Sequence, residues 1–112
     1  MPALKIHKKV KGANGQEILL TEGVYRHIQR THPEVIPWLD TALKTVISPD
    51  VVFDDGDDKV YLKKLPEEVK SFVQDEVEYC LVPVTKRSEG YLAIKTCYFI
   101  TEETFQRKTW KP

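Results

Sequence analysis

The feature that most constrains the fold is an apolar stripe with a helical period between residues 35 and 47. Its members recur at intervals of three and four residues, which places them on one side of a helix: Val35, Ile36, Leu39, Ala42, Leu43, Val46 and Ile47. Pro33 can open this helix, because a proline in the first turn loses no hydrogen bond. Pro37 should be tolerated there too, and Ser48-Pro49 ends the helix. A helix with one broad apolar face needs a second layer to cover it.

Strand patterns on both sides of this helix supply that layer. Turn signals at residues 12–15 (Gly-Ala-Asn-Gly) and at Asp55-Gly56 predict two hairpins, because Asn and Gly tolerate positive φ. Residues 65–73 indicate a short helical turn, and two long strands are expected at residues 78–85 and 91–101. Pro83 has no N–H to donate, so its strand should either lie at a sheet edge or carry a bulge.

Together these patterns predict an α+β fold. An N-terminal β-hairpin and two helices are expected to pack on one face of a roughly four-stranded antiparallel sheet. We expect a single domain over residues 1–112, with the hairpin at 1–20, the helical segment at 21–48 and the sheet at 51–101. A chain of 112 residues fits one hydrophobic core.

The composition narrows the classes of function. Seventeen basic residues balance seventeen acidic ones, so a site for a polyanion would have to be a local patch. Cys80 and Cys97 are expected to be small buried hydrophobes and do not form a disulfide framework. No apolar run resembles a signal core or a membrane span, so we expect the cytoplasm and no contact with a membrane. No pattern calls for a metal or another cofactor.

Residues 24–34 carry the densest set of chemically versatile side chains. Histidine titrates near neutrality and arginine binds phosphate with a bidentate fork. Thr21 can cap a helix that runs to about Thr31. On that helix His27 shares the inward face with Val24 and Ile28, whereas Arg26 and Arg30 lie on another face. His32 and Glu34 follow at the junction with the second helix.

The strand at residues 91–101 could bring partners to His27. Side chains alternate along a strand, and the set containing Ile94 and Ile100 is the more apolar one, so we expect it to face the helices. Thr96 and Tyr98 belong to that set. We therefore predict that His27 is at least half buried and reaches Thr96 or Tyr98 through a hydrogen bond or one bridging water.

Convergent His, Tyr and Thr side chains fit cleavage of a phosphodiester without a metal, which needs a base, an acid and groups that stabilise charge on phosphorus. His27 could be base or acid, and Tyr98 or His32 its partner. The cations that could hold phosphate are Arg26, Arg30 and Lys95.

Other interpretations stay open. An inward histidine is also common as a hydrogen-bonded core residue, and buried Tyr and Thr are ordinary in strands. The N-terminal hairpin, or an edge strand bearing Pro83, could pair with a partner protein or a second copy without any catalysis. Arg26, Arg30 and the start of the second helix could also bind phosphate without turnover.

Three segments resemble a known group of proteins: residues 27–34 (His-Ile-Gln-Arg-Thr-His-Pro-Glu), residues 47–52 (Ile-Ser-Pro-Asp-Val-Val) and residues 95–98 (Lys-Thr-Cys-Tyr). The chain resembles the phage-associated branch of the barnase, EndoU, colicin and RelE-type nuclease superfamily. That resemblance implies N-terminal helices, a four-stranded antiparallel sheet and a toxin-like ribonuclease that needs no metal and acts on RNA. It points to His27, Thr96 and Tyr98, and more weakly to His32, Lys95 and Arg30.

Overall fold

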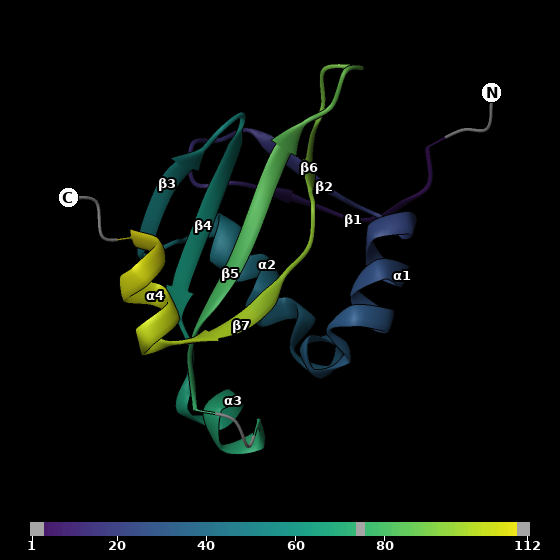
Figure 1. Ribbon diagram of the computed structural model, residues 1–112. Helices are drawn as coiled ribbons and strands as arrows, with labels where there is room; N and C mark the ends of the chain where they lie inside the picture. Colours follow the sequence, from purple (N-terminus) through teal and green to yellow (C-terminus); the bar gives the residue numbers. More distant parts are fainter. Residues whose placement is uncertain (1–3, 74–75, 110–112) are drawn as a thin grey trace.

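The computed structural model describes residues 4–73 and 76–109. These residues form one mixed sheet of seven strands with helices on both of its faces (Figure 1). In chain order the elements are β1 (Ile6–Lys11), β2 (Glu17–Thr21), α1 (Glu22–Thr31), the 3-10 helix η1 (Pro33–Trp38), α2 (Leu39–Ile47), β3 (Val51–Asp55), β4 (Asp58–Lys64), α3 (Glu67–Phe72), β5 (Val77–Lys86), β6 (Leu92–Ile94), β7 (Tyr98–Thr101) and α4 (Glu102–Thr109). The predicted α+β class is confirmed.

The sheet is larger than the sequence patterns suggested. Its order is β1-β2-β6-β5-β4-β3, and β7 also pairs with β5. Both predicted hairpins form, with Gly15 at φ +82° and Gly56 at φ +63° in their turns. β2 runs parallel to β6, with Ile18 opposite Leu92. The N-terminal hairpin therefore extends the sheet instead of packing on its face, and the sheet is mixed instead of purely antiparallel.

Helix α1 begins where the sequence predicted. The Thr21 side chain accepts a hydrogen bond from the Val24 amide at 3.3 Å, which satisfies one of the free N–H groups of the first turn. The helix buries Ile28 completely, and its outer face is exposed. This amphipathic helix is thus positioned by its cap, by Ile28 in the core, and by Val24 and Tyr25, which pack against the core.

The second predicted helix is split. Residues 33–38 form η1, and a regular α-helix begins only at Leu39. Pro37 explains the difference, because it lacks an N–H and disfavours the α conformation of the residue before it. The expectation that Pro37 would sit harmlessly in the first turn was wrong. α2 then buries Ala42, Leu43 and Val46 against the sheet, as the apolar stripe predicted.

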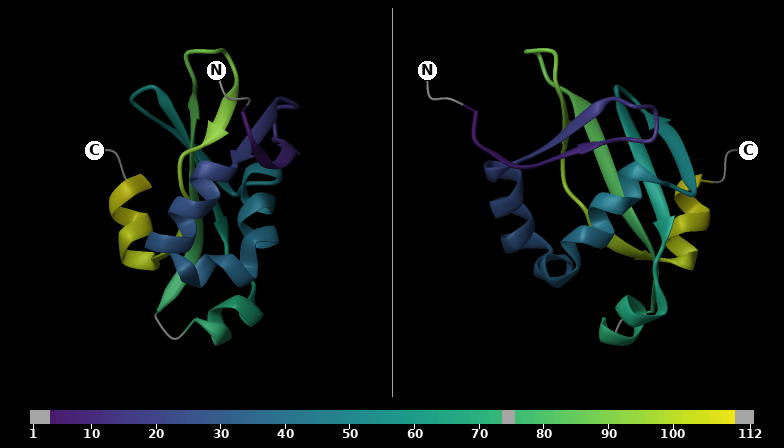
Figure 2. Two further views of the ribbon diagram at one scale, coloured as in Figure 1. Left: turned by 90° about the vertical axis from the view of Figure 1, so that its right-hand side faces the viewer. Right: turned by 180° about the vertical axis from the view of Figure 1, so that it is seen from behind.

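A C-terminal helix, which the sequence analysis did not predict, covers part of the opposite face of the sheet (Figure 2). Thr101 caps it by accepting a hydrogen bond from the Thr104 amide at 3.1 Å. Phe105 stacks on Tyr79, with 3.9 Å between ring centroids. The expectation of helices on one face was wrong, because α4 has few apolar residues and therefore gives little periodic signal.

The long strand expected at residues 91–101 is interrupted. Ile94 pairs with Val84 and Tyr98 with Leu81, so three steps along β5 match four steps along the partner. The interruption lies beside Pro83, whose carbonyl accepts a hydrogen bond from the Lys95 amide at 2.9 Å. The N–H and C=O groups of one residue point to the same side of a strand, so the missing N–H of Pro83 is on the side that faces the segment between β6 and β7. The interruption therefore lies where the proline cannot donate a hydrogen bond to that segment.

β5 is accordingly not an edge strand, since β4 lies on one side and β6 and β7 on the other. Of the two alternatives for the strand bearing Pro83, the bulge is the one that occurs. Pairing of a partner chain along this strand is ruled out, because both of its edges are already hydrogen-bonded within the sheet.

The extra residue changes which side chains face the helices. Ile94 and Cys97 belong to the large core cluster, with α1 and α2. Tyr98 and Ile100 pack instead in a second cluster on the other face, with Phe105 of α4. The prediction that Tyr98 and Ile100 share a face with Ile94 was therefore wrong. A one-residue irregularity turns every later side chain to the opposite face.

Candidate functional site

His32 is the histidine that meets Tyr98. It lies between α1 and η1, and its amide donates to the Ile28 carbonyl at 2.7 Å, which holds the junction in place. The imidazole stacks on the Tyr98 ring, with 5.0 Å between centroids and 22° between the planes. About a third of the His32 side chain remains exposed. The sequence ranked His32 below His27, but the structure brings His32 to the predicted tyrosine.

Glu34 adds a carboxylate to this pair. Its Oε1 lies 3.7 Å from the Nδ1 of His32, which is an ion-pair distance and too long for a hydrogen bond. Burial raises the pKa of the Cys97 thiol, and the neighbouring Cys80 thiol and Glu34 carboxylate raise it further. The charge of Glu34 therefore acts on Cys97, in the interruption between β6 and β7, as well as on His32. Glu34 was not among the site residues predicted from the sequence, although it belongs to the same His-Pro-Glu segment.

Thr96 carries an unexplained polar group close to Tyr98 in the sequence. It lies in the interruption, two residues before Tyr98, and its hydroxyl is buried without a hydrogen-bond partner. A buried hydroxyl without a partner costs about 1–3 kcal/mol, so such groups in folded proteins call for an explanation. The predicted hydrogen bond between His27 and Thr96 is thus absent.

His27 is partly buried, as predicted, but its polar contacts stay within its own helix. Its Nε2 lies 3.5 Å from the Thr31 hydroxyl, which itself donates to the His27 carbonyl at 2.8 Å. The predicted convergence of His27 with Thr96 and Tyr98 assumed an uninterrupted last strand. Because Tyr98 faces the other side of the sheet, His32 takes the place expected for His27.

The three predicted phosphate ligands differ in their surroundings. Arg26 and Arg30 are exposed on α1, and neither forms an ion pair within residues 4–73 and 76–109. Lys95 instead donates to the Asp58 carboxylate at 2.7 Å. Hydrogen bonds from Lys95 and then Thr85 hold the pKa of Asp58 below its usual value. The arginines are therefore free to bind a phosphate, whereas the charge of Lys95 is already compensated.

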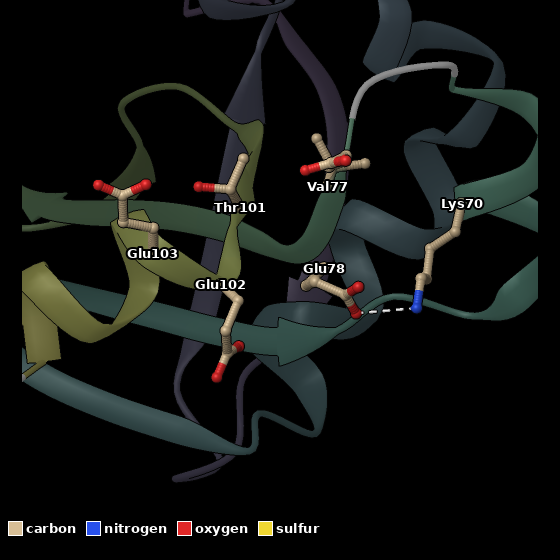
Figure 3. Close-up of a pocket in the computed structure, with 7 residues that line it drawn as sticks. Lys70, Val77, Glu78, Thr101, Glu102 and Glu103 are labelled. Atoms are coloured by element: carbon tan, nitrogen blue, oxygen red, sulfur yellow. Dashed lines mark ion pairs between the residues drawn. The ribbon is translucent and has the colours of Figure 1, made fainter.

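A hollow on the described surface lies elsewhere. It has a volume of about 530 Å³ and is lined by Lys70, Glu76, Val77, Glu78, Thr101, Glu102 and Glu103, near the start of β5 and the junction of β7 with α4 (Figure 3). Lys70 is paired with Glu78 at 2.8 Å. The remaining carboxylates repel phosphate groups, and none of the residues predicted from the sequence lines this hollow. It does not fit the polyanion chemistry of the His32 cluster.

Two further observations concern cofactors and membranes. In the part of the chain that the structure describes, no three His, Cys, Asp or Glu side chains are grouped so as to hold a metal ion. None of the helices in the same residues is long and apolar enough to cross a membrane.

Comparisons of the chain with protein-family models, with curated proteins and with solved structures give no match.

Proposed function

We propose that the protein cleaves RNA without a metal ion, at a site formed by His32, Tyr98 and Thr96. The observation that carries the proposal is the stack of His32 on Tyr98 with the Glu34 carboxylate beside the imidazole. The resemblance of residues 27–34 and 95–98 to the phage-associated nucleases of the barnase, EndoU, colicin and RelE type supports the same reaction. The site differs from the predicted one in its histidine.

The reaction is a transesterification within the RNA. A base removes the proton of a ribose 2′-hydroxyl, and the 2′-oxygen forms a bond to the adjacent phosphorus. The bond from phosphorus to the 5′-oxygen of the next nucleotide breaks, and an acid protonates that leaving oxygen. The products are a 2′,3′-cyclic phosphate and a 5′-hydroxyl, so no water or metal-bound hydroxide enters the step.

The residues of the cluster suit these roles. His32 can exchange a proton through Nε2, while Glu34 beside Nδ1 stabilises the positive charge that develops on the ring. The Tyr98 hydroxyl is the second proton-transfer group. Thr96 would donate its unpaired hydroxyl to a phosphate oxygen only after RNA displaces the side chains that now cover it, which would give that buried group a partner. Arg30, in the last turn of α1, supplies a cation for the charge on phosphorus.

The test is cleavage of total RNA and of a labelled single-stranded oligoribonucleotide in EDTA, between pH 5 and pH 8. We expect products ending in a 2′,3′-cyclic phosphate, and loss of cleavage by about 10²-fold or more in His32→Ala. His27→Ala is the matched control on the same helix and should retain most activity. A substrate with a 2′-deoxy nucleotide at the cleavage site should remain intact.

Three outcomes would contradict the proposal. The first is no cleavage in excess of His32→Ala at any pH. The second is cleavage that appears only with added divalent metal. The third is loss of cleavage in His27→Ala but not in His32→Ala, which would return the site to His27. RNA binding that depends on Arg26 and Arg30 without any cleavage would instead support a phosphate-binding domain without turnover.

A further inference from the structure

A second stacked pair of histidine and tyrosine lies at the other end of α1. The His7 ring of β1 stacks on the Tyr25 ring of α1, with 3.8 Å between centroids and 12° between planes. His7 Nδ1 also lies 2.9 Å from the Glu22 carboxylate, and the Glu22 amide donates to the Lys5 carbonyl at 3.0 Å. These contacts fix β1 against the first turn of α1. They do not involve the cluster around His32.

The two aromatic pairs lie along one line of the helix surface. Tyr25, Gln29 and His32 are spaced by four and three residues, which puts them on the same side of α1. Seven residues at the helical rise of about 1.5 Å separate Tyr25 from His32 by roughly 10 Å. At about 3.4 Å per stacked base, this distance corresponds to on the order of three nucleotides.

The side chains between the two pairs are basic and exposed. Arg26 and Arg30 each follow Tyr25 and Gln29 by one residue, which places them about 100° further around α1, on the neighbouring side of the helix. Neither arginine has a carboxylate partner within the described residues, as shown above. The Glu22 carboxylate contacts His7 and does not pair with either arginine. The surface of α1 therefore has a partly buried stacked pair near each end, with Tyr25 also packed against the core, and uncompensated positive charge on the neighbouring exposed side.

We infer that this surface of α1 is a binding track for single-stranded RNA, with the exposed part of the His7 and Tyr25 pair as a second base-stacking platform. This inference rests on the proposed ribonuclease function, because it places His32 at the cleaved phosphate. Single strands are bound in general by aromatic platforms for the bases together with cationic side chains for the backbone. The track extends the substrate by about three nucleotides beyond the scissile bond, and it requires no particular base sequence because every base has a π-face.

The decisive measurement is binding of a labelled 2′-O-methyl oligonucleotide of eight nucleotides, which cannot be cleaved because its 2′-oxygens are blocked. We expect Tyr25→Leu to weaken binding of the intact protein about fivefold or more, the range for loss of one base stack. Tyr25→Phe keeps the aromatic ring and should bind like wild type. His7→Leu provides a second test if Tyr25→Leu fails to fold.

The salt dependence tests the basic residues of the track. Arg26→Gln should reduce the slope of log affinity against log salt by about 0.7, the value for one phosphate contact on a single strand. Lys108→Gln on α4 removes one charge from an exposed position on the opposite face of the sheet. We expect this control to leave the slope unchanged.

The outcomes separate the track from the proposed function. In cleavage assays, Tyr25→Leu should lower kcat/KM for an octanucleotide but not for a dinucleotide, which is too short to reach the second platform. If wild type cleaves RNA and Tyr25→Leu binds and cleaves the octanucleotide normally, the track is wrong and the nuclease stands. If binding depends on Tyr25 but no RNA is cleaved, the track stands and the nuclease is wrong.

Discussion

The imidazole of His32 stacks on the phenol of Tyr98, with 5.0 Å between the ring centroids. This contact joins the junction after α1 to β7, a strand that pairs only with β5 in the described part of the sheet. The two rings come from segments more than sixty residues apart in the sequence. The stack is therefore a product of tertiary packing, and it places the two proposed proton-transfer groups together.

Two substitutions of Tyr98 test the role of its ring and the role of its hydroxyl separately. Tyr98→Phe keeps the stack on His32, so the free energy of unfolding should stay within about 0.5 kcal/mol of wild type. Cleavage should nevertheless fall by about 10²- to 10⁴-fold, because the acid or base is lost. Tyr98→Leu should in addition lose about 0.5–1.5 kcal/mol of stability with the aromatic contact. Urea denaturation and initial cleavage rates measure both effects, and full activity in Tyr98→Phe would remove the hydroxyl from the mechanism.

Thr96 offers a test in which stability and activity move in different directions. Thr96→Val has nearly the same shape and removes a buried hydroxyl that has no partner. We expect the free energy of unfolding to stay equal or to rise by up to about 1 kcal/mol. Cleavage should decrease, because the hydroxyl no longer reaches the phosphate.

Thr96→Ser retains the hydroxyl and is the control for activity. It should cleave much better than Thr96→Val, even though it loses a methyl group from a partly buried position. A clear loss of stability in Thr96→Val would mean that the hydroxyl has a structural partner in solution.

The Asp58–Lys95 pair predicts a specific dependence on pH. The folded protein lowers the pKa of Asp58, chiefly through the hydrogen bond from Lys95, so the pair stabilises the fold above the unfolded pKa of about 3.9. That stability is lost as the pH falls further, through the lower folded pKa. Because Lys95 is half exposed, we expect Asp58→Asn to cost only about 0.5 kcal/mol at pH 7.

The same pair can be examined by a double-mutant cycle. Lys95→Gln should cost about as much as Asp58→Asn at pH 7, and the double variant should cost no more than either one. All three differences from wild type should shrink when unfolding is measured near pH 3. Additive effects, or a difference that persists in acid, would show that the two side chains do not stabilise the fold through each other.

Helix α4 should contribute measurably to stability through two residues. Thr101→Ala removes the cap and should lower the free energy of unfolding by about 1 kcal/mol. Phe105→Ala exposes the second core cluster and removes the stack on Tyr79, for which we expect roughly 1–3 kcal/mol. Gln106→Ala, at an exposed position of the same helix, should change stability by less than about 0.5 kcal/mol. Equal effects of the three substitutions in urea denaturation would indicate that α4 does not pack on the sheet in solution.

Several elements follow from local sequence because their causes are local. Thr21 caps α1, and Gly15 and Gly56 adopt the positive φ of the two hairpin turns. Most of the apolar stripe of α2 meets the core as its spacing predicts, whereas Ile47 at its end is exposed. Helix α4 also has local signals, a Thr cap and acidic residues in the first turn, but these lack the apolar period on which the sequence analysis relied.

The position of the candidate site depended on contacts that no local pattern encodes. Alternation along residues 91–101 would place Tyr98 on the same face as Ile94, and thus beside His27. One extra residue opposite Pro83 reverses that alternation and brings Tyr98 to His32. The sequence by itself determined which residue types are present and which helices and turns carry them. Only the tertiary structure decided which of them meet, because the face of a strand residue depends on its register with a partner strand elsewhere in the chain.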